Sequence, residues 1–227
     1  LVTGAEVSES TAEVDVSGSE IVGGLVGSNS FDSKVTNSSA SGEVSGEVQV
    51  GGLIGSDSSG FGVANSSANG DVTGEERVGG LVGQSGSDTI DDNCIIVNSS
   101  ANGAVTGSAM VGGLVGANTN GSKISNTFAK SDVTGDEQVG GLVGGNRDGP
   151  IEESFVAGKV IKKGSSSGSI IGQLYSQFLP DGEEAILQNV YWDTQTTGLA
   201  IAVGPVGSGT GKVSTQGELS GLSTSEM

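Results

Sequence analysis

Carboxylates are the most abundant side chains in this sequence that could do chemistry. Asp and Glu supply 27 of the 227 residues, against 9 Lys plus Arg, for a formal net charge of -18. Asp88, Asp91 and Asp92 lie close together and form the best candidate calcium site, because hard cations prefer oxygen ligands. Neither an EF-hand loop nor the Gly-Gly-x-Gly-x-Asp nonapeptide is present. No cofactor other than calcium is predicted.

A second set of carboxylates recurs along the chain, at Asp15, Glu43, Asp71 and Asp132. Stacking the segments that carry them would bring like charges to about 5 Å, which is unfavourable between adjacent strands. Salt screening, bound divalent cations or exposure to water must relieve that repulsion. Two interpretations stay open: a solvated acidic face that keeps the protein soluble, and a row of calcium sites.

The remaining reactive groups argue against an enzyme. Serine is abundant, but the chain has no His to activate it. Cys94 is the single cysteine, so no internal disulfide can form, and we expect a small buried hydrophobe rather than a nucleophile. Catalytic carboxylate pairs are normally unique, whereas these acids recur along the chain. We therefore predict a non-catalytic protein.

Asparagines recur as well, at Asn37, Asn65, Asn98, Asn126 and Asn189. The first three begin Asn-Ser-Ser, a glycosylation sequon, and Asn120-Gly-Ser is a fourth. A glycosylated Asn must be exposed, whereas a structural Asn would form an inward hydrogen-bonded ladder or a turn. Asn126 favours a structural role, because it keeps the position without keeping the sequon.

A repeat determines how these residues are positioned. The string Gly-Gly-Leu-Val-Gly, or a variant of it, begins at Gly23, Gly51, Gly79, Gly112, Gly140 and Gly168. Successive starts are 28, 28, 33, 28 and 28 residues apart. The longer spacing reflects an insertion between Gln84 and Asn93, which we expect to be a surface loop. A fixed period of this length indicates a solenoid or a similar array.

Each repeat has the pattern of β-strands. Ala40, Gly42 and Val44 share one parity and Glu43 has the other, as a half-buried strand requires. No 3.6-residue apolar stripe is present. A unit with two short strands and glycine-rich corners cannot bury its own apolar face, but stacked units form continuous internal columns. We predict an all-β fold, a parallel β-solenoid of about 28-residue repeats over residues 1–175, in six to seven coils. Residues 176–227 are predicted to form a C-terminal loop and capping segment.

Both ends of the sequence contain repeat positions, with substitutions. Leu187 and Asn189 reproduce repeat positions, which places Trp192 where other units have Ala. We expect Trp192 to close the last coil, because terminal repeats need distinct caps; stacking on a glycan is the alternative. Leu1-Val2-Thr3 aligns with the Leu-Val-Gly of an earlier copy, so we expect a segment of a longer polypeptide.

Composition excludes several partners. Nucleic-acid binding needs clustered Lys or Arg, which the sequence lacks. No apolar run approaches the roughly 20 residues of a membrane span, so we expect no membrane insertion.

The glycine-rich strings resemble the GLUG motif repeats of bacterial and archaeal surface and secreted proteins. The resemblance covers Leu1 to about Leu174 and continues in Asn189-Val-Tyr-Trp-Asp-Thr-Gln-Thr-Thr-Gly and Gly221-Leu-Ser-Thr-Ser-Glu-Met227. It implies an extracellular or cell-surface, non-catalytic module, and it transfers no catalytic residue to this chain.

The expected role is a rigid stalk, spacer or adhesin body that contacts neighbouring domains of the same polypeptide. Two alternatives remain open. One is an adhesion module that binds calcium, a glycan or a host protein. The other is a self-assembling filament or surface-layer subunit, in which open coil ends pair between chains.

Overall fold

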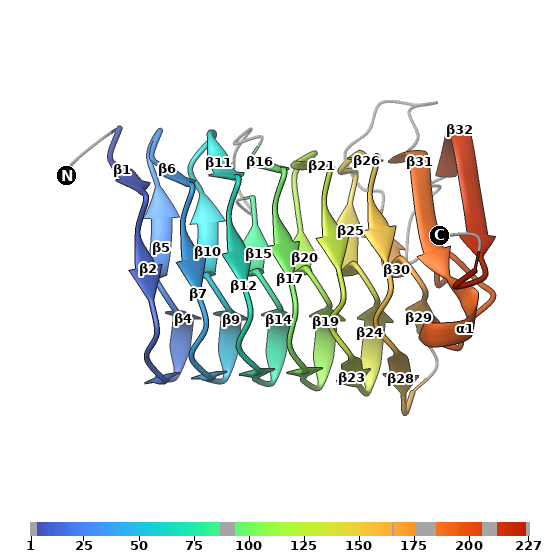
Figure 1. The fold of residues 1–227 in the computed structure, drawn as a ribbon, viewed down its shortest axis with the longest axis horizontal. Helices are drawn as coiled ribbons and strands as arrows, with labels where there is room; N and C mark the ends of the chain where they lie inside the picture. The colour runs from blue at the N-terminus through green and yellow to red at the C-terminus, as the bar shows by residue number, and fades with distance from the viewer. Residues whose placement is uncertain (1–3, 87–93, 165, 176–184, 206–212, 226–227) are drawn as a thin grey trace.

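The chain winds into a parallel β-solenoid of about seven turns, in which each repeat forms one turn (Figure 1). The computed structural model describes residues 4–86, 94–164, 166–175, 185–205 and 213–225. All strand pairs between these residues are parallel, and they join residues one repeat apart: Val35 pairs with Val7 and with Val63. The predicted all-β solenoid is confirmed.

Strands of successive turns stack into four sheets. The largest has 14 strands and two columns. The first column is β1 (Glu6–Ser8), β6 (Lys34–Thr36), β11 (Gly62–Ala64), β16 (Ile95–Val97), β21 (Lys123–Ser125), β26 (Ile151–Glu152) and β31 (Ala185–Asp193). The second column is β2 (Thr11–Ala12), β7 (Ser39–Ala40), β12 (Ser67–Ala68), β17 (Ser100–Ala101), β22 (Phe128–Ala129) and β27 (Phe155–Val156). The long strand β31 pairs with both β26 and β27, and so joins the two columns, and β32 (Val213–Leu222) pairs with β31.

The other three sheets have six strands each. One contains β3 (Val16–Ser17), β8 (Val44–Ser45), β13 (Val72–Thr73), β18 (Val105–Thr106), β23 (Val133–Gly135) and β28 (Val160–Lys162). The next contains β4 (Glu20–Gly23), β9 (Val48–Gly51), β14 (Glu76–Gly79), β19 (Ala109–Gly112), β24 (Glu137–Gly140) and β29 (Ser167–Gly168). The last contains β5 (Val26–Ser30), β10 (Ile54–Ser58), β15 (Val82–Ser85), β20 (Val115–Asn118), β25 (Val143–Arg147) and β30 (Ile171–Tyr175).

A turn therefore contributes up to five short strands, and the expectation of two per repeat was wrong. Each glycine-rich string joins two strands across a bend: Gly51 ends β9, Gly52-Leu53 forms the bend, and Ile54 begins β10. A strand is recognised in a sequence by its alternating apolar and polar side chains. Glycine has no side chain, so a glycine-rich strand lacks this pattern. The insertion does not disturb the stack, since Val63 pairs with Ile96 and Ser85 with Asn118 across it.

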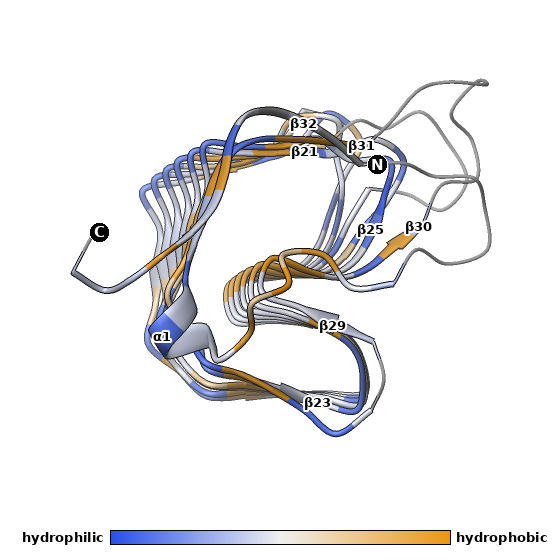
Figure 2. Ribbon diagram, turned by 90° about the vertical axis from the view of Figure 1, so that its right-hand side faces the viewer, coloured by the Kyte–Doolittle hydropathy of each residue, from blue (hydrophilic) through white to orange (hydrophobic). Residues whose placement is uncertain are grey.

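The cross-section has two lobes, each with its own core (Figure 2). The larger core lies between the 14-stranded sheet and the β5–β30 sheet, and contains the buried Leu and Val or Ile of the strings, such as Leu53 and Ile54. The smaller core lies between the β3–β28 and β4–β29 sheets, and its buried members are all valines, such as Val44 and Val50. Equivalent side chains of successive turns form the columns that the repeat predicts.

Close packing at the waist between the lobes explains the paired glycines. A Cβ atom on Gly52 would overlap with the carbonyl of Gly80 in the next turn and would lie 2.8 Å from the Cβ of Ala68. A Cβ on Gly51 would overlap with the carbonyl of Ile54 and would lie 2.6 Å from the amide nitrogen of Gly83. The obstacles are mainly backbone atoms, which cannot rotate away, so both positions require glycine.

The C-terminal segment covers the last turn. Ala202 accepts hydrogen bonds from the amides of Ile170 (2.8 Å) and Ile171 (3.1 Å), so this stretch runs along β29 and β30. Trp192 is 6% exposed and lies in register with Val156, in the column that Ala holds elsewhere. Its Nε1 donates to the Leu199 carbonyl at 3.2 Å. The helix α1 (Thr194–Thr197) begins directly after β31.

The first turn is open by comparison. Within the described part of the chain, no strand pairs with the outer edges of β1 to β5. Leu25 and Val26 are only partly buried, although their equivalents Leu53 and Ile54 are fully buried. Among the described residues, the outer edges of this turn therefore have no strand partner, and Leu25 and Val26 form an apolar rim beside them.

Candidate functional site

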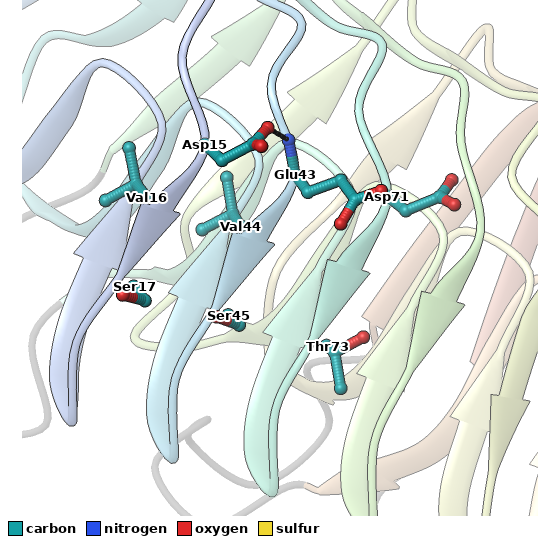
Figure 3. Close-up of a pocket in the computed structure, with 8 residues that line it drawn as sticks. All are labelled: Asp15, Val16, Ser17, Glu43, Val44, Ser45, Asp71 and Thr73. Carbon is teal, nitrogen blue, oxygen red and sulfur yellow. Dashed lines mark hydrogen bonds between the residues drawn. The ribbon is translucent and has the colours of Figure 1, made fainter.

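The recurring carboxylates form a ridge at the corner before the β3–β28 sheet (Figure 3). Asp15 Oδ1 accepts a hydrogen bond from the Glu43 amide of the next turn at 2.9 Å. Asp71 accepts from the Ala104 amide at 2.7 Å, and Asp132 from the Lys159 amide at 2.8 Å. One oxygen of each Asp thus ties its turn to the next. This structural use was not predicted from the sequence.

A shallow cavity of about 150 Å³ lies beside the ridge, between Asp15, Glu43, Asp71 and Thr73. Nowhere among the described residues do three or more Asp, Glu, His or Cys side chains converge on one point as metal ligands would. The carboxylates follow one another along the ridge, about 4.8 Å apart in the stack. The other calcium candidates, Asp88, Asp91 and Asp92, lie outside the described residues, so calcium binding there stays a prediction.

The recurring asparagines occupy a sharp turn between β6 and β7 and its equivalents. Asn37, Asn65, Asn98 and Asn126 are exposed, Asn189 is half-buried, and all five have φ near +50°. Asn tolerates this left-handed conformation better than most residues. The structure therefore places them at a turn rather than in an inward ladder. Glu9 and Glu153 adopt the same conformation in the turns that lack Asn.

Glycosylation remains a prediction for Asn37, Asn65, Asn98 and Asn120. The first three are exposed, and Asn120 is half-buried with φ +51°. The Asn98 side-chain nitrogen donates to Asn65 Oδ1 at 3.1 Å. That nitrogen is the atom a glycan would modify, so glycosylation of Asn98 would break this contact.

The inward hydrogen-bonded ladder is built by the residue after each Asn. Ser38, Ser66 and Ser99 are buried. The amide of Ser38 donates to Ser66 Oγ at 3.1 Å, and the amide of Ser66 donates to Ser99 Oγ at 3.2 Å. Each hydroxyl donates in turn to the carbonyl two residues earlier. The Asn-Ser pair is thus a structural signal, since Asn makes the turn and Ser joins the turns.

A second inward column, in the β5–β30 sheet, is polar and was not predicted from the sequence. Its polar members, in register and at most 5% exposed, are Asn29, Asp57, Ser85, Asn118 and Asn146, and Leu174 follows them in the last turn. Asn29 Nδ2 donates to Asp57 Oδ1 at 3.0 Å, and Asn118 Nδ2 donates to Asn146 Oδ1 at 2.8 Å. Between these two bonds, three oxygens have no hydrogen-bond partner: Asp57 Oδ2, Ser85 Oγ and Asn118 Oδ1.

Burial raises the pKa of Asp57 to about 6, although hydrogen bonds from Ser59 and Asn29 act in the opposite direction. Cys94 is fully buried next to it, and its Sγ donates to the Asp57 carbonyl at 3.3 Å. Burial, and then the charge of Asp57, raise the pKa of the Cys94 thiol. A buried thiol with a raised pKa is a poor nucleophile.

Aromatic side chains gather on the outer face near the C-terminal end, at Phe128, Phe155 and Tyr191. These residues are register partners on adjacent strands. Lys130 Nζ lies 5.8 Å from the Phe128 ring centroid, and the Tyr191 hydroxyl donates to Glu218 at 2.8 Å. Aromatic pairs across strands stabilise a sheet, so the stripe reinforces the last turns.

Comparison with known proteins identifies the repeat. The family model of the GLUG motif matches residues 18–45, 74–106 and 107–134, which confirms the resemblance found in the sequence. Residues 46–73, between the first two matches, form an equivalent turn in the same register. No curated protein and no solved structure matches the chain. No described helix is long and apolar enough to cross a membrane.

Proposed function

We propose that this chain of GLUG motif repeats is a non-catalytic spacer, a rigid rod within a larger secreted or cell-surface protein. Its partners in this role are the neighbouring domains of the same polypeptide, which the rod keeps at a fixed distance. The extracellular location rests on the resemblance to surface and secreted proteins.

The observation that carries this proposal is the unbroken register of the stack. Val16, Val44, Val72, Val105, Val133 and Val160 pair in sequence across six strands of one sheet. The other sheets keep the same register, and the buried serines and ridge carboxylates add hydrogen bonds between turns. Each turn therefore extends the rod by about 4.8 Å.

The described chemistry supports a non-catalytic role. The ridge carboxylates repeat from turn to turn and bind backbone amides, so they do not form a unique acid–base pair. The thiol of Cys94 is buried, and the sequence has no His.

Electron–electron distance measurements on spin labels test the rigidity. Ser17 and Ile161 are exposed and lie five register steps apart in one sheet, so labels attached to S17C and I161C should be separated by about 24 Å between their Cα atoms. Cys94 is buried, so the exposed thiols are modified selectively. A rigid spacer gives one narrow distance distribution.

Two further variants provide the control. Labels at S45C and I161C should be about 5 Å closer together than the labels at S17C and I161C, because Ser45 lies one register step nearer to Ile161. Deletion of residues 46–73 removes one turn in phase, since Ser45 and Thr73 are equivalent, and should shorten the first distance by the same step. A broad or multiple distribution in the intact chain, or no shortening after a deletion that still folds, would contradict the spacer.

A further inference from the structure

The sequence contains three Asn-Gly pairs, Asn69-Gly70, Asn102-Gly103 and Asn120-Gly121. Glycine has no Cβ to shield its backbone nitrogen, so this nitrogen can attack the side-chain amide of the preceding asparagine. The attack needs a glycine amide that is not held by a hydrogen bond, and an asparagine side chain that water can reach. The structure places the three pairs in different surroundings.

The first two pairs occupy the same position in consecutive turns, at the bend from the 14-stranded sheet to the β3–β28 sheet. Both Asn69 and Asn102 are exposed. The amides of Gly70 and Gly103 form no hydrogen bond with any described residue. At both pairs the attacking nitrogen and the side chain that it attacks are therefore accessible.

The third pair is held differently. Asn120 is half-buried and has φ +51°. The Gly121 amide donates to the Arg147 carbonyl of the next turn at 3.3 Å. Attack at this pair would first have to break that hydrogen bond, so the fold protects it.

The stack requires glycine at the first two pairs. A Cβ on Gly70 would overlap with the carbonyl of Gly42, and a Cβ on Gly103 would overlap with the carbonyl of Gly70. The position before the glycine is less restricted. Its occupants in the other turns are Ser41, Lys130 and Ala157. The fold therefore keeps the glycine that makes each pair reactive, whereas the exposed asparagine before it can be replaced.

We propose that Asn69 and Asn102 are deamidation sites of the folded protein and that Asn120 is protected. The Gly70 nitrogen forms a bond to Asn69 Cγ, the bond from Cγ to Nδ2 breaks, and the glycine amide proton leaves with Nδ2 as ammonia. Water then opens the succinimide ring at one of its carbonyls and gives aspartate or isoaspartate. Asn102 reacts with Gly103 in the same way. The net change is hydrolysis of one amide at each site, which needs no oxidant or reductant.

Isoaspartate lengthens the main chain at this bend by one carbon. Ala68, in the larger core, and Val72, in the smaller core, flank the first pair and are in register with both neighbouring turns. An extra main-chain atom between them conflicts with the constant spacing of the two columns. We therefore expect the modified chain to melt at a lower temperature. This modification goes beyond the spacer role and does not depend on it.

Peptide mapping by mass spectrometry, after warm incubation of the intact chain at mildly alkaline pH, tests the proposal. A deamidated peptide gains the mass difference between OH and NH₂, and electron-transfer fragmentation distinguishes isoaspartate from aspartate. We expect Asn69 and Asn102 to be converted at least tenfold faster than Asn120 in the folded chain. In urea, where Gly121 loses its hydrogen bond, the three rates should become similar.

The variants N69S and N102A are the matched controls, because each introduces a residue that an equivalent turn carries. The melting temperature of the wild type should fall as conversion proceeds, and that of the double variant should stay constant during the same incubation. Equal rates at the three asparagines of the folded chain would overturn the proposal. So would an absence of conversion at Asn69 and Asn102 in folded protein whose unfolded form reacts at all three sites.

Discussion

Replacing Asp57 by Asn should stabilise the protein at neutral pH. Asp57 is 0% exposed, and its Oδ2 has no hydrogen-bond partner. Ionisation therefore leaves a charge in the core without a cation beside it, which is costly. Asparagine has nearly the same shape and is neutral. It retains an oxygen to accept from Asn29 and gains an NH₂ group where Asp57 has Oδ2.

The magnitude follows from the pKa. Burial raises the pKa of Asp57 from 3.8 to about 6, and each unit corresponds to about 1.4 kcal/mol, so ionisation costs the folded state about 3 kcal/mol. Because the folded pKa lies above the unfolded value, the native state binds more protons between pH 4 and 6. The contribution of Asp57 to stability is thus fully present below about pH 4 and is lost as pH rises through 6.

The polar column offers the ionised Asp57 no cation. Asp57 Oδ2, Ser85 Oγ and Asn118 Oδ1 lie on consecutive strands and have no hydrogen-bond partners. Cys94, held at the Asp57 carbonyl, is the other titratable group packed against Asp57.

Urea unfolding of both proteins between pH 4 and 8 measures the effect. Asp57→Asn should gain about 3 kcal/mol at pH 7.5 and almost nothing at pH 4. Glu47→Gln, which removes an exposed carboxylate, is the control for net charge and should show a much smaller difference. A difference between wild type and Asp57→Asn that does not change with pH, or a loss of stability at pH 7.5, would refute the reasoning.

Four further predictions concern the stack, its ends and the insertion. Gly79→Ala should lower the free energy of unfolding by about 3 kcal/mol, because its Cβ would overlap with the Val82 carbonyl; Ser45→Ala, on an exposed position, is the control. Trp192→Ala should cost about 3–5 kcal/mol in the same assay by emptying the core of the last turn. If the self-assembling alternative holds, light scattering over a hundredfold concentration range should show growth in mass; the spacer predicts a constant monomer mass. If Asp88, Asp91 and Asp92 bind calcium, millimolar calcium should raise the melting temperature beyond a NaCl control of equal ionic strength, and equal shifts would argue against a site.

The solenoid could be predicted because stacking converts a sequence period directly into a spatial one. Val35, Val63 and Ile96 are equivalent in the sequence and neighbours in the sheet. The same logic predicts the place of Trp192, which lies in register with Val156 at the end of the column that begins with Ala12 and Ala40. What the period did not reveal was the path within one turn. Strands such as β9 and β10 lie on either side of Gly52-Leu53, and the glycines there carry no side chain from which the alternation could be read.

The polar column and the proximity of Arg77 and Arg147 could not be predicted from the sequence, for a different reason. Asn29, Asp57 and Ser85 share a column but differ chemically, so no recurring letter marks them. Arg77 and Arg147 are 70 positions apart and come from different strands of the repeat. Only the two-lobed cross-section, which turns the β14 and β25 strands toward a common groove, brings them together.

In a stack of equivalent turns, the residues that break a column identify where one turn differs from the rest. Asp57 is the ionisable member of a polar column whose other polar members are neutral. This exception has a local cost, because burial disfavours the charged carboxylate. A neutral side chain at position 57 would serve a rod that only separates its neighbours. The pH response of Asp57 therefore measures what this turn does beyond maintaining a fixed length.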